Sequence, residues 1–223
     1  MSDKKTVVIT GANRGIGLEL ARRYAGEGCR VIGVCRSSSD ELSEVAEQVI
    51  DGVDVTTDAG IEKLTSALGD EQIDLLINNA GLLQDDQLGS IDFDSIRTQM
   101  EINAYAPLRV VEALVSRIPS GGKIANITSR MGSIADNDSG GRYGYRASKA
   151  ALNAFGKSLA VDLQPKGIAV AQLHPGYVKT RMVNFGGLIT PAESALGLVE
   201  RINQLSLENS GSFWHSNGEE LPW

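Results

Sequence analysis

Several residue types are scarce in this sequence, and each shortage excludes a class of protein. There are two cysteines, Cys29 and Cys35, in 223 residues. On one strand their Cα atoms would lie roughly 20 Å apart, well beyond the ~7 Å that a disulfide tolerates. Two histidines, His174 and His215, and scattered carboxylates are too few and too dispersed to indicate a metal site. We therefore expect small buried cysteines in a reducing compartment and no bound metal.

Positive charge and long apolar runs are lacking as well. The 21 basic residues are outnumbered by 28 acidic ones, for a net charge of −7, and form no basic stripe. A nucleic-acid partner is therefore not expected. The chain has no run of ~18 uncharged apolar residues that would span a membrane. These features predict a cytoplasmic protein with no membrane partner. The length suits one α/β domain over residues 1–223.

Strand-like and helix-like segments alternate along the chain. β-branched and apolar runs predict strands at residues 6–10, 30–35, 52–55, 73–78, 123–128, 168–173 and 212–214. Helical spacing predicts helices at residues 15–27, from Ser39 onward, and at 57–68, 92–118, 145–163 and 192–204. Such alternation predicts an α/β fold: a doubly wound parallel sheet of about seven strands with helices on both faces. In these sheets ligands bind beyond the carboxyl ends of the strands.

A glycine-rich turn follows the first predicted strand. It reads T-G-x-x-x-G-x-G and contains Gly11, Asn13, Arg14, Gly15, Ile16 and Gly17. Glycines let the backbone approach a phosphate, which the free N–H groups of the next helix attract. Many helices begin with such a turn, but its place directly after the N-terminal strand favours phosphate binding.

The end of the second predicted strand indicates which dinucleotide would bind. An NAD site places a carboxylate there for the ribose 2′-hydroxyl, yet no carboxylate occurs between Arg36 and Asp40. Arg36 together with Arg14 would instead pair with a 2′-phosphate. We therefore expect NADP(H) in preference to NAD(H). The alternative is that both arginines are ordinary solvated charges.

Tyr145 and Lys149 are four residues apart, one turn along the same helix face. A free tyrosine has a pKa near ~10, too high for proton transfer at neutral pH. A neighbouring ammonium should lower it, so the pair could work as an acid/base unit. The spacing alone is weak evidence, because it also arises by chance.

Together these pieces resemble the short-chain dehydrogenase/reductase family in content, order and spacing. The segments that carry the resemblance are Thr10–Gly17, Asn78–Gly81, Asn103, Thr128–Ser129, Tyr145–Lys149, and Pro175–Gly176 with Thr180. Residues 130–134, 144–153 and 220–223 are most similar to the C-factor and sniffer-type carbonyl reductases. The resemblance implies a Rossmann-type fold and an oxidoreductase that interconverts a carbonyl and an alcohol.

The resemblance also implies roles for particular residues. Tyr145 would be the general acid/base, and Ser129 would donate a hydrogen bond to the substrate oxygen. Lys149 would lower the Tyr145 pKa and hold the nicotinamide ribose. Asn103 would hold a relay water. Further cofactor contacts would be Asp54, Val55, Asn79, Ala80, Gly81, Pro175, Gly176, Val178 and Thr180. Asn79 and Gly81 could instead serve only their turn, and Thr180 could be only a helix cap.

The remaining expectations concern substrate and assembly. A short substrate loop is expected at residues 181–191, with an apolar face from Met182, Val183, Phe185 and Leu188, and a C-terminal strand and tail at 212–223. The expected partner is a small carbonyl or alcohol, and the resemblance suggests a homodimer or homotetramer. Two other functions stay open: a dinucleotide-binding signalling protein, and a hydrolase that uses Ser129 with His174, although no G-x-S-x-G motif is present.

Overall fold

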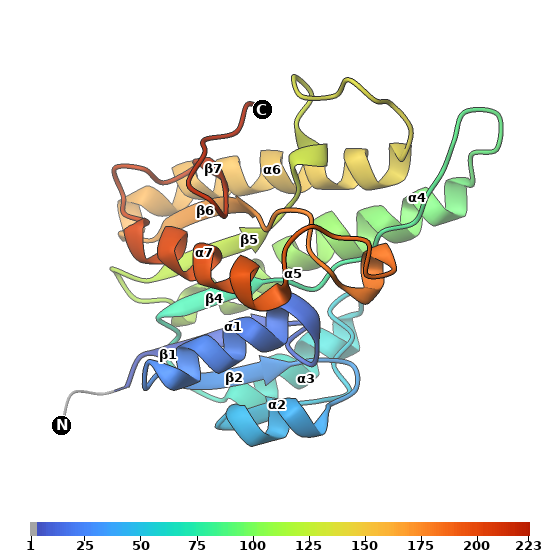
Figure 1. Ribbon diagram of the computed structural model, residues 1–223. Helices are drawn as coiled ribbons and strands as arrows, with labels where there is room; N and C mark the ends of the chain where they lie inside the picture. Colours follow the sequence, from blue (N-terminus) through green and yellow to red (C-terminus); the bar gives the residue numbers. More distant parts are fainter. Residues whose placement is uncertain (1–3) are drawn as a thin grey trace.

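The computed structural model describes residues 4–223, and a sheet of seven parallel strands forms its centre (Figure 1). The strand order is β3-β2-β1-β4-β5-β6-β7, so the chain changes direction across the sheet between β1 and β4. This topology confirms the predicted doubly wound α/β fold. The strands are β1 (Thr6–Thr10), β2 (Arg30–Val34), β3 (Gln48–Ile50), β4 (Leu75–Asn78), β5 (Lys123–Ile127), β6 (Ala169–His174) and β7 (Phe213–His215).

Helices cover both faces of the sheet, as predicted. The α-helices are α1 (Gly15–Gly26), α2 (Asp40–Val45), α3 (Asp58–Leu68), α4 (Phe93–Met100), α5 (Ala106–Leu114), α6 (Tyr143–Leu163) and α7 (Pro191–Gln204). One buried cluster joins α1, α2 and α7 to the sheet, and a second joins α3, α5 and α6 to its other face. In Figure 1, α1 and α7 lie on the near face and α6 on the far face. No helix within residues 4–223 is long and apolar enough to cross a membrane.

The prediction of the third strand was wrong in position. We expected residues 52–55, but β3 is Gln48–Ile50, paired with β2. Gly52 has φ +62°, which turns the chain away from an extended path directly after β3. The strand is three residues long, too short for an alternating pattern to locate it.

Three amide side chains form a buried ladder across β4, β5 and β6. Asn78, Asn126 and Gln172 are register partners in adjacent strands. Asn78 Nδ2 donates to Asn126 Oδ1 at 2.9 Å, and Asn126 Nδ2 donates to Gln172 Oε1 at 3.1 Å. Helix α6 packs directly on this ladder, because a Cβ at Gly156 would overlap Gln172 Oε1. The ladder therefore fixes the distance between α6 and the sheet.

The C-terminal tail returns to the loop between β5 and α6. The Trp223 carbonyl oxygen accepts from Ser133 Oγ at 3.0 Å, Ile134 N at 3.1 Å and Ala135 N at 2.9 Å. The Trp223 ring packs against Phe213 of β7, with ring centroids 5.3 Å apart. The tail thus braces the segment that follows Ser129.

The cysteines are free, and Cys35 is buried as expected. Cys29 is only partly buried, because it lies in the turn before β2 rather than within the strand.

Candidate functional site

The glycine turn lies between β1 and α1, at the carboxyl edge of the sheet. Gly11 has φ +65°, a left-handed conformation, and its N–H donates to Val34 O of β2 at 2.8 Å. A Cβ at Gly17 would overlap the Gly11 carbonyl oxygen, so α1 begins in contact with the turn. Gly15 and Ile16 are the first residues of α1, and within residues 4–223 no side chain caps its first N–H groups. This cradle has the form of a phosphate-binding site.

The Asn79–Gly81 segment after β4 supports this turn. Asn79 Nδ2 donates to Thr10 O at 3.0 Å and to Gly11 O at 3.1 Å, and the Asn79 and Ala80 N–H groups donate to Thr10 Oγ1. The Asn79 side chain therefore joins the Asn79–Gly81 segment to the glycine turn. Its backbone and that of Ala80 remain at the edge of the cradle.

Arg14 and Arg36 come from neighbouring loops. Asn13 Nδ2 donates to Ser37 O at 2.8 Å, and Ser39 Oγ donates to Asn13 O at 3.0 Å, so the two loops are bonded to each other. Ser39 also caps α2, as predicted. Within residues 4–223, neither Arg14 nor Arg36 forms a salt bridge. Both guanidinium groups are therefore available to an anion.

Asp54 lies beyond β3 rather than at its end. One carboxylate oxygen accepts from Thr56 N at 3.0 Å and Thr56 Oγ1 at 2.7 Å, and these bonds hold the pKa of Asp54 below its usual value. Val55 follows it in the same turn. A pocket of about 470 Å³ lies between this turn and the α4 region, lined by Asp54, Thr56, Arg97, Thr98, Glu101 and Ile102. Of these, only Asp54 was predicted, because no motif marks the other five.

Ser129, Tyr145 and Lys149 are brought together at the ends of β5 and α6. All three are buried. Ser129 Oγ accepts from Met131 N at 3.1 Å, and its hydroxyl lies beside the Tyr145 phenol. Lys149 Nζ lies 6.0 Å from the Tyr145 ring centroid and donates to Ile127 O at 2.9 Å.

The predicted fall in the Tyr145 pKa was wrong in direction. Burial raises the pKa of Tyr145, and the nearby Ser129 hydroxyl and Arg142 charge act against that rise without overcoming it. Burial also lowers the pKa of Lys149 to about 8. Lys149 is thus partly neutral near pH 8. Its Nζ also donates to the Ile127 carbonyl oxygen. For both reasons Lys149 provides less positive potential at the Tyr145 phenol than the four-residue spacing suggests.

Asn103 lies in a π-helical turn, Glu101–Tyr105, that interrupts the helix expected over residues 92–118. Its side chain is fully buried. Asn103 Nδ2 donates to Leu82 O at 2.7 Å and Ser148 Oγ at 3.0 Å, while Oδ1 accepts from Leu82 N at 2.8 Å. Asn103 therefore joins the loop after β4 to α6. A Cβ at Gly81 would lie 3.3 Å from Asn103 Oδ1 and 3.7 Å from Lys149 Nζ, so these three residues meet.

The segment after β6 covers the glycine turn. The Pro175 carbonyl oxygen accepts from Ser194 Oγ at 2.7 Å and Ser216 Oγ at 3.2 Å, and Gly176 has φ +88°. Val178 is buried and bridges to Ile189. Thr180 lies over Gly15, since its Cγ2 would be 3.5 Å from a Cβ there. Thr180 precedes a short 3-10 turn without a side-chain cap bond, so the helix-cap alternative is not supported.

Two further features lie near the candidate site: the loop after Thr180 and the pair of histidines, His174 and His215. Three of the four apolar loop residues are exposed: Met182, Phe185 and Leu188. The imidazole of His174 packs edge-on against that of His215, with centroids 4.8 Å apart, and burial lowers the pKa of His174 to about 3. Within residues 4–223 no hydrogen bond joins His174 to Ser129, and this favours a structural histidine over a hydrolase base.

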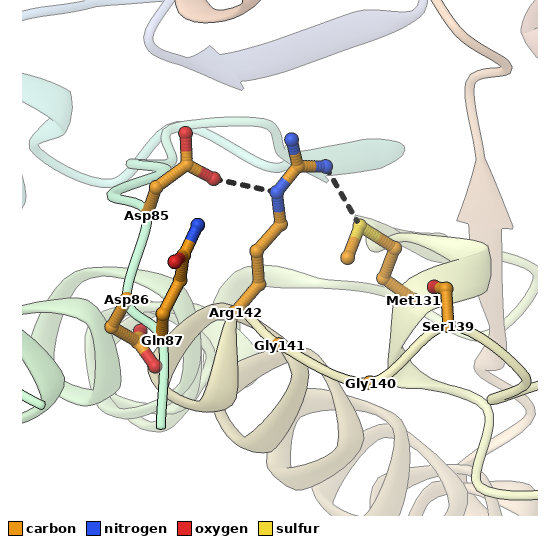
Figure 2. Close-up of a pocket in the computed structure, with 8 residues that line it drawn as sticks. All are labelled: Asp85, Asp86, Gln87, Met131, Ser139, Gly140, Gly141 and Arg142. Atoms are coloured by element: carbon orange, nitrogen blue, oxygen red, sulfur yellow. Dashed lines mark hydrogen bonds and ion pairs between the residues drawn. The ribbon is translucent and has the colours of Figure 1, made fainter. Parts of the chain in front are cut away.

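A second pocket, of about 420 Å³, opens where α6 begins (Figure 2). It is lined by Asp85, Asp86, Gln87, Met131, Ser139, Gly140, Gly141 and Arg142. Figure 2 shows the Arg142 side chain between Asp85 and Met131. No motif predicted this pocket.

Comparison with known proteins agrees with this geometry. The family model described as short chain dehydrogenase matches residues 5–186. The 1-hydroxy-2-glutathionyl-2-methyl-3-butene dehydrogenase of Rhodococcus sp. (strain AD45) is 40% identical over 224 residues, covering 98% of this chain and 99% of the relative. The C-signal protein of Myxococcus xanthus is 41% identical over 154 residues, covering 68% of this chain and 93% of the relative.

Solved structures with the same fold include carbonyl reductases. The carbonyl reductase Sniffer of D. melanogaster superposes with a TM-score of 0.88 at 27% identity, covering 99% of this chain and 100% of that chain. A carbonyl reductase from Pseudomonas aeruginosa PAO1 in complex with NADP gives a TM-score of 0.87 at 34% identity, with coverage of 99% and 100%. The resemblance to the sniffer-type and C-factor proteins is thereby confirmed.

Proposed function

Because the chain belongs to the short chain dehydrogenase family, we propose that it is an NADP(H)-dependent oxidoreductase that interconverts a ketone or aldehyde and an alcohol. The observation that carries this proposal is the convergence of Ser129, Tyr145 and Lys149, all buried, beside a glycine cradle at one edge of the sheet. A protein that only bound a dinucleotide would have no need of a buried phenol beside a hydroxyl at this place.

The reaction balances as one hydride and one proton. When bound, NADPH supplies the hydride to the carbonyl carbon. Tyr145 donates its phenolic proton to the carbonyl oxygen, and Ser129 donates a hydrogen bond to the same oxygen as it gains charge. In the reverse direction Tyr145 accepts the proton from the alcohol as a phenolate, so the raised pKa requires alkaline pH for alcohol oxidation. Its raised pKa suits the acid role, because the phenol stays protonated at neutral pH until an oxygen anion forms nearby.

Lys149 and Asn103 support this proton transfer. Lys149, with a pKa of about 8, exchanges protons near neutrality. We infer that it also holds the nicotinamide ribose, for which its ammonium retains donors beyond the bond to Ile127 O. The Asn103 side chain bonds to Leu82 and Ser148, so we infer that a relay water would be held by the main chain of the π turn and not by this side chain.

The residues around the cradle fit a dinucleotide. The Gly11–Gly17 turn and the α1 N-terminus would hold the pyrophosphate, because within residues 4–223 no side chain caps the start of α1, and uncapped helix N–H groups attract phosphate. Arg14 and Arg36 would pair with the 2′-phosphate, and Asp54 with Val55 would line the adenine. The adenosine ribose would contact the Asn79–Gly81 backbone, and the nicotinamide would contact Pro175, Gly176, Val178 and Thr180.

We further propose that the single domain covers residues 1–223, of which 1–3 lie outside the described residues, and that residues 181–191 form the substrate loop. A small-molecule substrate is supported by the relatives, one of which is named for a glutathionyl alcohol and others as carbonyl reductases. A cytoplasmic homodimer or homotetramer stays a prediction.

The first experiment compares NADPH and NADH binding by cofactor fluorescence at matched concentrations. Selective NADPH binding followed by NADPH-dependent reduction of an aldehyde panel would support the proposal. Tyr145→Phe should retain NADPH binding and lose turnover. Failure to bind either dinucleotide would refute the assignment, while equal binding would refute only the role of Arg14 and Arg36.

A second candidate is a signalling protein in which catalysis is secondary, favoured by the 41% identity to C-signal. Tyr145→Phe separates the two functions in a cell. If a biological response survives the loss of turnover, the signalling candidate is supported.

A further inference from the structure

The 420 Å³ pocket lies beside the proposed acid/base residues but is distinct from the dinucleotide cradle. Met131, on one wall, donates its N–H to Ser129 Oγ at 3.1 Å. Arg142, on another wall, precedes Tyr145 by three residues, and its charge acts on the Tyr145 phenol. A substrate whose carbonyl oxygen reached Ser129 and Tyr145 could therefore extend a substituent into this pocket.

The pocket suits a polar substituent. Of its eight lining residues, Met131 alone has an apolar side chain (Figure 2). The buried Asp86 carboxylate does not face a ligand as a free charge. It accepts from Tyr143 N at 2.7 Å and Gly144 N at 3.1 Å and so caps the start of α6. Arg142 and Asp85 are the charged groups left to face a ligand.

Within residues 4–223, neither terminal nitrogen of the Arg142 guanidinium donates to an oxygen. Its Nε donates to Asp85 Oδ1 at 2.6 Å, whereas Nη1 donates to the Met131 sulfur at 3.8 Å. A thioether is a weak acceptor, so the pair of nitrogens that grips a carboxylate in two parallel bonds keeps its capacity. Both side chains of the Arg142–Asp85 pair are partly exposed, and such a pair is weak enough to rearrange around a ligand.

Arg142 has an unfavourable backbone conformation. Its φ of +51° is left-handed, which is unusual for a residue other than glycine. Arg142 N donates to Asp86 O at 2.9 Å, which fixes the loop to the segment after β4. This strained conformation carries the guanidinium into the pocket.

We propose that this pocket binds a carboxylate on the substrate, with Arg142 as the residue that pairs with it. The substrate class is then a carbonyl or alcohol compound bearing a carboxylate, as an amino-acyl or peptidyl derivative does. This inference rests on the proposed function, since it assigns a specificity-determining residue to the same reaction.

The test compares two aldehydes that differ only in charge, 4-carboxybenzaldehyde and methyl 4-formylbenzoate. The measured quantity is the ratio of their kcat/KM values with NADPH. Arg142→Asn removes the guanidinium with a residue that tolerates the left-handed conformation. We expect it to lower the carboxylate-to-ester ratio about 10- to 100-fold. Any general effect through the Tyr145 pKa cancels in this ratio.

Two further variants sharpen the result. Arg22→Gln, on α1, removes the same charge far from the pocket and should leave the ratio at its wild-type value. Asp85→Asn removes the competing anion at Arg142 and should raise the ratio several-fold. A ratio unchanged in Arg142→Asn, with both aldehydes reduced, overturns this inference and leaves the proposed function standing.

If neither aldehyde is reduced, the proposed function is in question, and binding tests the pocket by itself. Isothermal titration calorimetry with 4-carboxybenzaldehyde needs no turnover. Binding at least 10-fold weaker in Arg142→Asn than in wild type supports the pocket. Equal binding, or no binding to the wild-type protein, overturns it.

Discussion

The buried amide ladder leaves no room for a methyl group on the α6 residue that packs against it, Gly156. A Cβ there would overlap Gln172 Oε1 and lie 3.1 Å from Asn126 Nδ2. Gly156→Ala should therefore strain the packing of α6 on the sheet and also break the Asn126–Gln172 bond. Both effects should reach the candidate site, since α6 carries Tyr145 and Lys149.

The expected change in the free energy of unfolding combines two destabilising effects and one stabilising effect. Overpacking a well-packed core costs about 1–3 kcal/mol. A buried amide left without its partner costs about 1–3 kcal/mol. Alanine is favoured over glycine inside a helix by about 1 kcal/mol. We expect the free energy of unfolding to fall by about 1–5 kcal/mol, with a drop in Tm of roughly 2–4 °C per kcal/mol for a chain of this size.

Gly26→Ala is the matched control. Gly26 also lies in a helix, α1, and a Cβ there would meet nothing within 4 Å. This variant should be unchanged or up to about 1 kcal/mol more stable. Urea unfolding followed by circular dichroism measures both variants. If Gly156→Ala is as stable as Gly26→Ala, the ladder does not set the position of α6 and the reasoning fails.

Three other predictions concern the site. Arg36→Asp should weaken NADPH binding relative to NADH by about 10- to 100-fold, measured by fluorescence titration, because a 2′-phosphate loses its cation and meets a carboxylate; an unchanged ratio would show that Arg36 is an ordinary surface charge. The lowered pKa of Lys149, about 8 in the folded state against 10.5, means that the unfolded state binds more protons between pH 8 and 10. Wild-type stability should therefore rise with pH across that window more steeply than that of Lys149→Met, and parallel urea-unfolding curves would refute the shift. Asn103→Ala removes three bonds that hold Leu82 and Ser148; we expect a loss of about 2–4 kcal/mol of stability and slower turnover, and wild-type values for both would contradict the joining role.

Local patterns were enough to predict the parts of the site that depend on neighbouring residues. The turn at Gly11–Gly17 and the Tyr145–Lys149 pair each lie within one short segment, so their spacing could be read from the sequence, and the order of all the motifs together gave that spacing its meaning. The doubly wound sheet followed from the alternation of strands and helices, and its observed order confirms it.

Features that depend on distant segments were missed. Periodicity predicted one helix over residues 92–118, and helical structure does run from Phe93 to Arg117, but the pattern did not show the π turn at Glu101–Tyr105. The direction of the Tyr145 pKa shift depends on burial by the whole site, which the four-residue spacing does not report. The pocket around Arg142 joins the loops after β4 and β5, and no short motif spans that distance.

The contact of Trp223 with Ser133, Ile134 and Ala135 has a practical consequence for handling the protein. A tag or fusion partner joined after Trp223 would leave the molecule from the loop that carries Ser129, and so would crowd the mouth of the candidate site. One joined ahead of β1 would leave from the amino edge of the sheet, away from the carboxyl ends of the strands. Activity screens should therefore use amino-terminal fusions, and a weak result from a carboxyl-terminal fusion should be checked after the tag has been cleaved.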